Sequence, residues 1–165
     1  MIIAMLLVSL AGCASSFASS DRQPESNSRV DAPVVSSLTF SWPEKWRIQV
    51  ISDKHADIYN DNDVYIGYIS AIDVAKDFDF AQFKPNHSSI IDEESFDIPL
   101  GECSLYTLDA DNGTAASGIT GTHNEYYAVI RTANRTILII NWSMKDKKAE
   151  TKQQLIGLLN KISVK

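Results

Sequence analysis

The chain has 165 residues, of which 44% are hydrophobic and 22% are charged, with 7 Gly and 5 Pro. This composition is typical of a single globular domain and excludes collagen-like and wholly disordered chains. The formal net charge of -6 disfavours the basic surface with which proteins bind nucleic acids, so we expect no nucleic-acid partner. The two cysteines, Cys13 and Cys103, are too few for a disulfide framework.

The N-terminal segment 1–12 carries no charge, and its apolar run Ile2–Val8 leads into the sequence Leu10-Ala11-Gly12-Cys13. An apolar run followed by small residues is the layout of a signal peptide and its cleavage site. The run is too short to span a bilayer as a helix. The four residues at 10–13 resemble the bacterial lipobox, in which Leu stands three residues before the cysteine and two small residues lie between them.

The lipobox resemblance implies that segment 1–12 is a signal peptide that is removed and that Cys13 is lipidated. The sulfur would carry a diacylglyceryl group, and the freed amine would carry a further acyl chain such as palmitate. Each buried methylene contributes about 0.8 kcal/mol, so several chains would hold the protein at a membrane surface. Ala14 stands where inner-membrane lipoproteins of enteric bacteria typically have Asp. The resemblance therefore implies the outer membrane, with the protein facing the periplasm.

Residues 13–37 have the composition of a disordered tether that starts at the lipidated cysteine. Of the 24 residues after Cys13, 8 are Ser, and Pro24 and Pro33 interrupt the chain without any periodic apolar pattern. As a flexible coil this segment would have an end-to-end distance of about 25 to 30 Å. We expect the remaining residues, 38–165, to form one domain.

The patterns of this domain predict an α+β fold with an antiparallel sheet. Alternation of apolar and polar residues at 38–42 and 46–50 fits two strands, or one strand and a turn, and two further strands are expected at 56–59 and 64–72. Pro43 separates the first two. The turn formers Asn60-Asp61-Asn62-Asp63 join the last two into a hairpin.

The middle of the chain predicts one short helix and then further strands. Val74, Phe78 and Ala81 have helical spacing, and Pro85 ends that helix. After a polar segment at 88–95, four more strands are expected, at 96–100, 102–109, 119–132 and 136–142. Ile137-Leu138-Ile139-Ile140 is apolar on both faces, which predicts a central strand covered on both sides.

The C-terminal part predicts an amphipathic helix that packs on the sheet. Ser143-Met144-Lys145-Asp146 has the pattern of a capping box, with Asp in place of the usual Glu, and would begin the helix. The helix would present one apolar stripe, formed by Leu155, Ile156, Leu158, Leu159 and Ile162. We expect this stripe to pack against the sheet residues Tyr126, Tyr127, Val129, Ile130 and Trp142.

Together these features resemble the PsbP-like fold, and in particular the DcrB-like bacterial lipoproteins. The resemblance is carried by Leu38-x-Phe40-x-x-Pro43 with Trp46, by the long hairpin from Leu105 to Asn141, and by the terminal helix. It implies an antiparallel sheet between helices and a binding or adaptor role without catalysis. Ala14 departs from the family, whose lipoproteins tend to have Asp after the cysteine.

Charge is distributed unevenly along the domain. Residues 44–102 hold 13 acids and 5 bases, whereas residues 103–165 hold 5 acids and 8 bases. An acidic face could attract a cationic partner surface and accelerate its encounter, although solvated loops explain the same charges. The candidate partner-binding residues in this acidic half are Asp57, Asp61, Asp63, Asp92, Glu93 and Glu94.

The sequence supplies no motif for a cofactor, and we expect none. Asp109-Ala110-Asp111-Asn112-Gly113 resembles part of a calcium loop, but Thr120 stands where the bidentate Glu is needed, so turns explain it better. Cys103 is expected to be a buried apolar residue. A nucleophilic pair of Cys103 and His123, or a base at His55, is a weaker possibility without a surrounding motif.

We therefore expect a non-enzymatic lipoprotein, anchored to the membrane through Cys13, that binds an unknown protein or maintains the envelope from the periplasmic side. The alternative is an immunity protein that blocks a secreted toxin acting in the periplasm. The aromatic residues Trp42, Tyr59, Tyr65 and Tyr68 beside the acidic groups would suit such an interface.

Overall fold

The computed structural model describes residues 35–41, 45–73, 78–113, 116–133, 135–143 and 150–165. Lipobox residue Cys13 and most of the predicted tether lie outside these ranges. The described elements, in chain order, are η1 (Val35–Ser37, a 3-10 helix), β1 (Leu38–Phe40), β2 (Arg47–Ser52), β3 (His55–Tyr59), β4 (Tyr65–Asp73), α1 (Phe80–Phe83), β5 (Ser88–Ile98), β6 (Gly101–Asp111), β7 (Thr122–Thr132), β8 (Thr136–Ser143), α2 (Glu150–Leu159) and β9 (Ile162–Val164). Within the described ranges, no helix has the length and hydropathy needed to cross a membrane.

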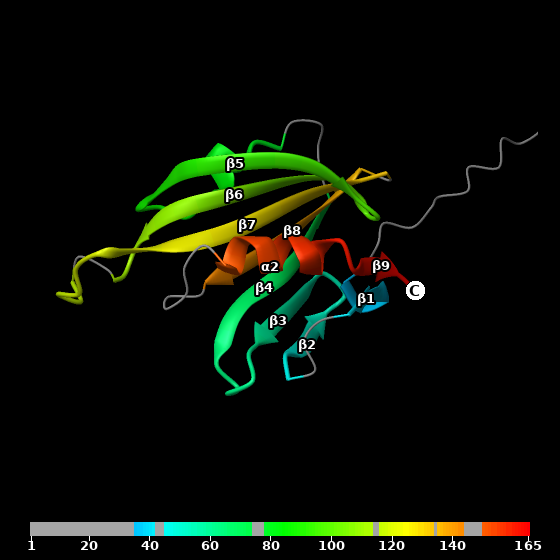
Figure 1. Ribbon diagram of the computed structural model, residues 1–165, viewed down its shortest axis with the longest axis horizontal. Helices are drawn as coiled ribbons and strands as arrows, with labels where there is room; N and C mark the ends of the chain where they lie inside the picture. Colours follow the sequence, from blue (N-terminus) through cyan, green and yellow to red (C-terminus); the bar gives the residue numbers. More distant parts are fainter. Residues whose placement is uncertain (1–34, 42–44, 74–77, 114–115, 134, 144–149) are drawn as a thin grey trace, which may run out of the picture.

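The architecture is α+β and mostly antiparallel sheet, as the sequence predicts. Seven strands form one sheet in the order β2-β3-β4-β8-β7-β6-β5, and every neighbouring pair is antiparallel. The short strands β1 and β9 pair separately beside it. The predicted hairpin around Asn60–Asp63 is confirmed as β3 and β4. Figure 1 shows the curved sheet with α2 lying across it.

The larger hydrophobic core lies on the side of the sheet that carries α2. Leu155, Leu158 and Leu159 of the helix belong to one buried cluster with sheet residues such as Trp142 and Ile130. Leu159 and Trp142 are fully buried, at 0% exposure. Burial of such side chains contributes roughly 1.5 to 3 kcal/mol each, so this face is expected to supply much of the folding free energy.

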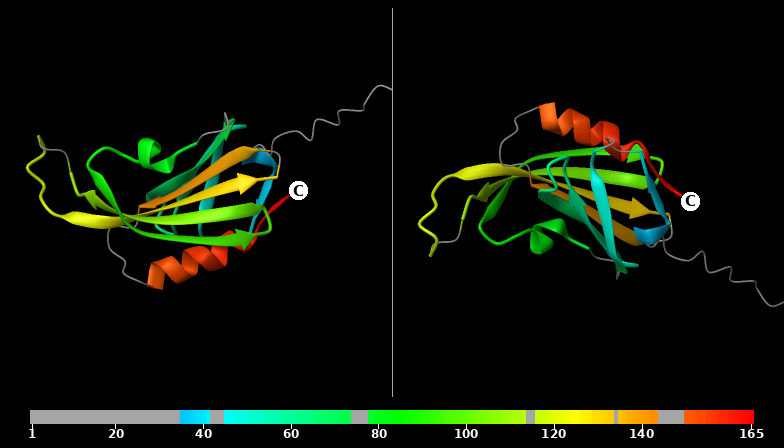
Figure 2. Two further views of the ribbon diagram at one scale, coloured as in Figure 1. Left: turned by 90° about the horizontal axis from the view of Figure 1, so that it is seen from above. Right: turned by 90° about the horizontal axis from the view of Figure 1, so that it is seen from below.

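The opposite face of the sheet carries the short helix α1 and a smaller core. Phe80 stacks on Tyr106 with 4.2 Å between ring centroids and contacts Tyr127. The cluster on this face contains Phe80, Leu108, Tyr127, Val129, Ile137 and Ile139. Figure 2 shows α1 and α2 on opposite sides of the sheet. The central strand β8 contributes residues to both clusters, which confirms the prediction that it is covered on both sides.

In the middle of the chain, one prediction was wrong, and the predicted short helix is confirmed as α1, which ends just before Pro85. The polar segment 88–95 is most of β5, an 11-residue strand at the edge of the sheet. Most of its side chains are exposed, so it lacks the apolar alternation that marks a half-buried strand. The short helix extends over Phe80–Phe83 alone, with Asp79 as its N-cap through a hydrogen bond from the Ala81 amide; Val74 lies outside the described residues.

Two further expectations are corrected near the C-terminal helix. Ser143 is the last residue of β8, and the rest of the predicted capping box, Met144 to Asp146, lies outside the described residues. Ile162 belongs to β9, where it pairs with Phe40. Tyr127 and Val129 face α1, because side chains alternate along β7 and Tyr126 and Ile130 take the α2 side.

The folded part of the chain includes residues that were assigned to the tether. Val35 is 1% exposed and belongs to the larger core cluster. Its amide donates a hydrogen bond to the carbonyl oxygen of Asp53, 2.7 Å away. The domain therefore begins at Val35 or earlier, three residues before the predicted boundary at Leu38.

Candidate functional site

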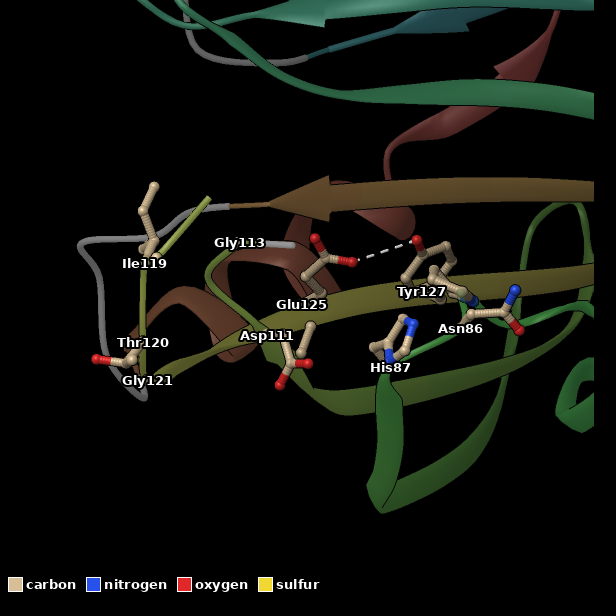
Figure 3. A pocket seen from close by; sticks show the side chains of 12 residues that line it. Asn86, His87, Asp111, Gly113, Ile119, Thr120, Gly121, Glu125 and Tyr127 are labelled. Atoms are coloured by element: carbon tan, nitrogen blue, oxygen red, sulfur yellow. Dashed lines mark hydrogen bonds between the residues drawn. The ribbon is translucent and has the colours of Figure 1, made fainter. Parts of the chain in front are cut away.

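An open cavity of about 780 Å³ lies on the α1 face, where β6 ends and β7 begins. Its polar lining combines two carboxylates, Asp111 and Glu125, with the imidazole of His87 and the phenol of Tyr127. Figure 3 shows these four side chains around the cavity, with Ile119, Thr120 and Gly121 on the far wall. The cavity is open, unlike the enclosed pockets of most small-molecule sites, so its convergent polar groups are its main binding feature.

The far wall is formed by the connection between β6 and β7, whose glycines allow its shape. Gly118 and Gly121 have φ of 68° and 90°, values that favour glycine. A Cβ on Gly113 would lie 2.5 Å from Ser117 Oγ and 2.8 Å from Ile119 Cβ. A side chain at residue 113 would therefore displace the wall. On the other side of the cavity, His87 adopts φ of 61° just before β5.

Glu125 joins the cavity to the interior of the domain. Its Oε2 accepts a hydrogen bond from the hydroxyl of Tyr127, 3.3 Å away, and its side chain is 17% exposed. Tyr127 in turn contacts the hydroxyl of Tyr68 on β4. Burial raises the pKa of Tyr127, and the nearby charge of Glu125 raises it further. Tyr127 is therefore a neutral hydrogen-bond donor at physiological pH.

His123 lies behind Glu125 and is almost fully buried, with a side-chain exposure of 6%. Its Nδ1 is 2.9 Å from Asn112 Oδ1, and its Nε2 is 3.2 Å from Glu125 Oε1. Asn112 also donates from Nδ2 to the carbonyl of Thr120, at 3.4 Å, which orients its Oδ1 toward the histidine. With both ring nitrogens facing oxygen atoms, the imidazolium form of His123 satisfies both contacts.

Ser143 completes this polar cluster but is not placed as an activated nucleophile. Its Oγ lies 3.4 Å from His123 Nε2, and Asn112 on the other nitrogen gives the order of a Ser-His-Asn triad. The Glu125 carboxylate lies closer to the same nitrogen, at 3.2 Å, and so competes with Ser143 for that position. In a catalytic triad, the serine occupies that position. The cluster is better suited to holding Glu125 in place.

The structure separates the six predicted acidic residues into two groups. Asp57 lies on β3, where its Oδ1 is 3.1 Å from Nε2 of His55. Asp61 and Asp63 lie in the turn that follows, and Asp63 pairs with Arg47 at 2.5 Å. Asp92, Glu93 and Glu94 lie on β5, at the other side of the sheet. Four strands separate β3 from β5, so the six residues do not form one acidic face.

The β5 group has a structural partner on helix α2. Lys152 pairs with Asp92 at 2.5 Å and with Glu94 at 2.8 Å. The hydrogen bond from Lys152 holds the pKa of Asp92 below its ordinary value. These contacts tie the helix to the edge strand and neutralise part of the acidic charge. Charged side chains on an edge strand also discourage pairing with other chains.

Cys103 is buried as predicted, with 0% exposure on the α2 face. Burial raises the pKa of its thiol to about 12, so the thiol is protonated at physiological pH. The residue pairs with Ile130, whereas His123 pairs with Ala110, seven positions further along β7. At about 3.4 Å per residue they are roughly 24 Å apart, which separates this proposed nucleophile from its base.

The described residues include no group of three or more His, Cys, Asp or Glu side chains arranged to hold a metal ion. In the turn that contains Asp61 and Asp63, the side-chain oxygen of Asn60 accepts hydrogen bonds from the amides of Asn62 and Val64, both at 3.0 Å. These hydrogen bonds form the turn that the sequence predicted at Asn60–Asp63.

The cavity residues were missed at the sequence level. His87, Asp111, Glu125 and Tyr127 did not stand out, and His123 was considered as a ligand and as a partner of Cys103. A usable signal was present in His123-x-Glu125-x-Tyr127, where period-two spacing places three polar side chains on one face of a strand. The contribution of Asn112 and Ser143 depends on strand pairing and had no local signal.

No protein-family model matches the chain, and no curated protein and no solved structure matches it.

Proposed function

We propose that this protein is a lipid-anchored envelope protein that binds a ligand or partner without catalysing a reaction. Segment 1–12 would be the signal peptide and Cys13 the lipidated residue, so that the domain faces the periplasm, anchored in the outer membrane. The binding site would be the cavity at the junction of β6 and β7. The observation that carries the binding role is the convergence of Asp111, Glu125, His87 and Tyr127 on one open cavity.

The arrangement of the polar groups supports binding in preference to catalysis. Glu125 is held from behind by His123 and from the side by Tyr127, which leaves a fixed carboxylate at the cavity wall. Prepositioned polar groups reduce the entropy cost of binding a ligand. The buried thiol of Cys103 and the contact of His123 with Glu125 both disfavour nucleophilic chemistry at the residues first considered for it.

We also propose that the domain is PsbP-like, of the DcrB-like lipoprotein type. An antiparallel sheet with helices on both faces agrees with what that resemblance implies.

The alternative function is immunity to a toxin that acts in the periplasm. It is favoured by the exposed aromatic group at the turn between β3 and β4. Tyr59 and Tyr65 are in edge-to-face contact at 5.9 Å, and the guanidinium of Arg47 lies 4.1 Å above the ring of Tyr59. Tyrosine and arginine are common among the residues that dominate binding interfaces. Of the other residues proposed for this interface, Tyr68 is in the hydrogen-bonded network and Trp42 lies outside the described residues.

The anchor is tested by fractionating cells that express a Cys13→Ser variant. We expect this variant to keep segment 1–12 and to lose acylation, with Cys103→Ala as the control that keeps both processing and lipid. Metabolic labelling with an alkyne-bearing palmitate reports the acylation directly. An unchanged mass and unchanged palmitate incorporation in Cys13→Ser would contradict the anchor.

The binding site is tested in intact cells with a photo-crosslinking amino acid at Ile119, on the cavity wall. We expect a crosslinked product that is lost when Glu125→Gln is added. The same amino acid at Tyr65 tests the alternative, because an immunity protein would crosslink to its toxin from that position. A product at Ile119 that is insensitive to Glu125→Gln would contradict a role for the cavity.

A further inference from the structure

The point where the described chain begins lies at one end of the domain. Val35 and Ser36 bond to Asp53, in the turn between β2 and β3. The C-terminal Lys165 donates from its amide to the carbonyl of Ser37, at 2.9 Å. Figure 1 shows β1, β9 and the C-terminus together at this end of the molecule. Any chain that leads from Cys13 must therefore enter the domain here.

Three large apolar side chains are exposed in the segments that flank this entry point. Val50 and Ile51, at the end of β2, are 51% and 54% exposed. Val164, at the end of β9, is 53% exposed. We call these three residues the entry patch. Lys165 follows Val164 directly, whereas Ser52 and Asp53 separate Ile51 from Lys54, which pairs with Asp73.

The cavity lies away from the entry patch. The amide of Ala71 donates a hydrogen bond to the carbonyl oxygen of Lys54. In the sheet, Ala71 lies opposite Leu138, which in turn lies opposite Ile130. The cavity is lined on β7 by Glu125 and Tyr127, and its far wall, at Gly118–Gly121, lies beyond Thr122. Along β7, Tyr127 is three positions from Ile130, or about 10 Å, and Thr122, next to the far wall, is eight positions away, or about 27 Å. The cavity is also displaced sideways, toward the β5 edge of the sheet.

We propose that the entry patch rests on the lipid bilayer, so that the cavity faces away from the membrane. The inference rests on the proposed lipidation of Cys13. Residues 14–34, between the anchor and Val35, can span at most about 75 Å, and a chain of that length does not by itself orient the domain. It does keep the entry patch close to the lipid. The high effective concentration of lipid near the patch then favours even a weak apolar contact. Exposed apolar side chains beside a lipid anchor suit the boundary between headgroups and acyl chains.

The orientation is tested on the lipidated protein in vesicles of phosphatidylethanolamine and phosphatidylglycerol. A fluorophore is attached to Ile51→Cys or to Ile119→Cys, and a lipid-borne nitroxide is used as the quencher. The thiol of Cys103 is buried and Cys13 would be acylated, so the label is specific. Ile119 is the matched control because it is 60% exposed and lies at the cavity. We expect at least threefold stronger quenching at residue 51, whereas equal quenching would overturn the proposal.

A second experiment tests whether the entry patch contacts the bilayer or is only nearer to it than the cavity is. In a protein labelled at Val164→Cys, Ile51→Asp should remove at least half of the quenching. Val64→Asp, at a residue with 54% exposure in the turn between β3 and β4, should leave it unchanged. Because both residues are exposed, neither change is expected to unfold the domain, and the melting temperature checks this. Quenching that survives Ile51→Asp would overturn the bilayer contact.

A failure of the anchor gives a different result. Wild-type protein without acyl chains would remain at the bottom when the vesicles are floated on a density gradient, which contradicts the lipidation of Cys13 and the bilayer contact with it. Protein that floats but is quenched equally at residues 51 and 119 is lipidated and has no preferred orientation. If the patch instead binds a protein, floating protein would show no quenching at residue 51.

Discussion

The two faces of the sheet differ in how their buried surface is composed. The α2 face is covered by one apolar cluster that extends from Val35 through Trp142 to Leu159. The α1 face has a smaller apolar cluster around Phe80, and beyond it the same strands carry His123, Glu125 and Ser143. A four-residue helix cannot cover an 11-residue strand, so part of the α1 face is left for polar groups and a cavity.

Under the proposed function, stability and binding are divided between the two faces. Changes on the α2 face should act mainly on the free energy of unfolding, because they remove apolar burial. Changes at the polar end of the α1 face should act on ligand binding with a smaller cost in stability. The following variants test the division.

The largest effect is expected from Leu159→Ala on the α2 face. Leu159 is fully buried against the sheet, and its truncation should lower the free energy of unfolding by about 2 to 5 kcal/mol. Chemical denaturation measures the change, and Gln154→Ala on the exposed side of the same helix is the control. An unchanged denaturation midpoint would show that α2 is not part of the core.

Cys103→Ser places a hydroxyl in the same apolar cluster and should lower the free energy of unfolding by about 1 to 3 kcal/mol.

The buried thiol of Cys103 also predicts that the free energy of unfolding falls at alkaline pH. Its pKa is raised in the folded protein from 9.0 to about 12, so its contribution to stability is present below pH 9 and is lost as the pH rises toward 12. In a Cys13→Ser variant, a thiol reagent at pH 8 should react with Cys103 after unfolding and not before. Rapid reaction in the native state would contradict the burial.

Tyr127→Phe tests the polar end of the α1 face. It removes the hydroxyl that donates to Glu125 and should cost about 1 kcal/mol in the free energy of unfolding. The same change should weaken the crosslink from Ile119 more strongly than it weakens the fold. Tyr65→Phe, at a tyrosine with 48% exposure, is the control for the loss of a phenolic hydroxyl. A stability loss as large as that of Leu159→Ala would contradict the division between the faces.

The smallest effect is expected from Lys152→Met, which breaks the ion pairs between α2 and β5. Because the pKa of Asp92 is lowered in the folded protein, this contribution is present above the carboxyl's ordinary pKa of 3.8 and is lost as the pH falls through the lowered value. The variant should therefore differ from the wild type at pH 7 and approach it below pH 4. NMR titration of Asp92 should show a higher pKa in the variant. Lys161→Met is the control.

Sequence patterns predicted the elements that bury one or both faces. The alternation in β6 and β7, the apolar run of β8 and the helical stripe at Leu155, Leu158 and Leu159 all identified buried side chains. The alternation of apolar and polar residues failed to predict a strand whose two faces are equally exposed. β5 is an edge strand with exposed side chains on both sides, so its residues 88–95 carried no alternation.

The cavity was beyond prediction because its groups come from elements whose order in the sheet is not encoded locally. Asn112 and Ser143 become neighbours of His123 through the pairing of β6, β7 and β8, whereas Glu125 is its neighbour on β7 itself. The order of strands in the sheet also explains why the six predicted acidic residues lie in two separate groups. Asp57 and Asp92 belong to one acidic half of the sequence, and the sheet order places them at opposite sides.

The amino-acid sequence by itself determined which segments are apolar and with what period, because a side chain's free energy of burial depends on its own chemistry. It thus specified the strands with a buried face, the central position of β8, the buried state of Cys103 and the amphipathic C-terminal helix. The tertiary structure decided which strands are neighbours and which side chains share a face. Those relations depend on the closure of long chain segments, so the tertiary structure brought His87, Asp111 and Glu125 to one cavity and left the chain entry at the other end.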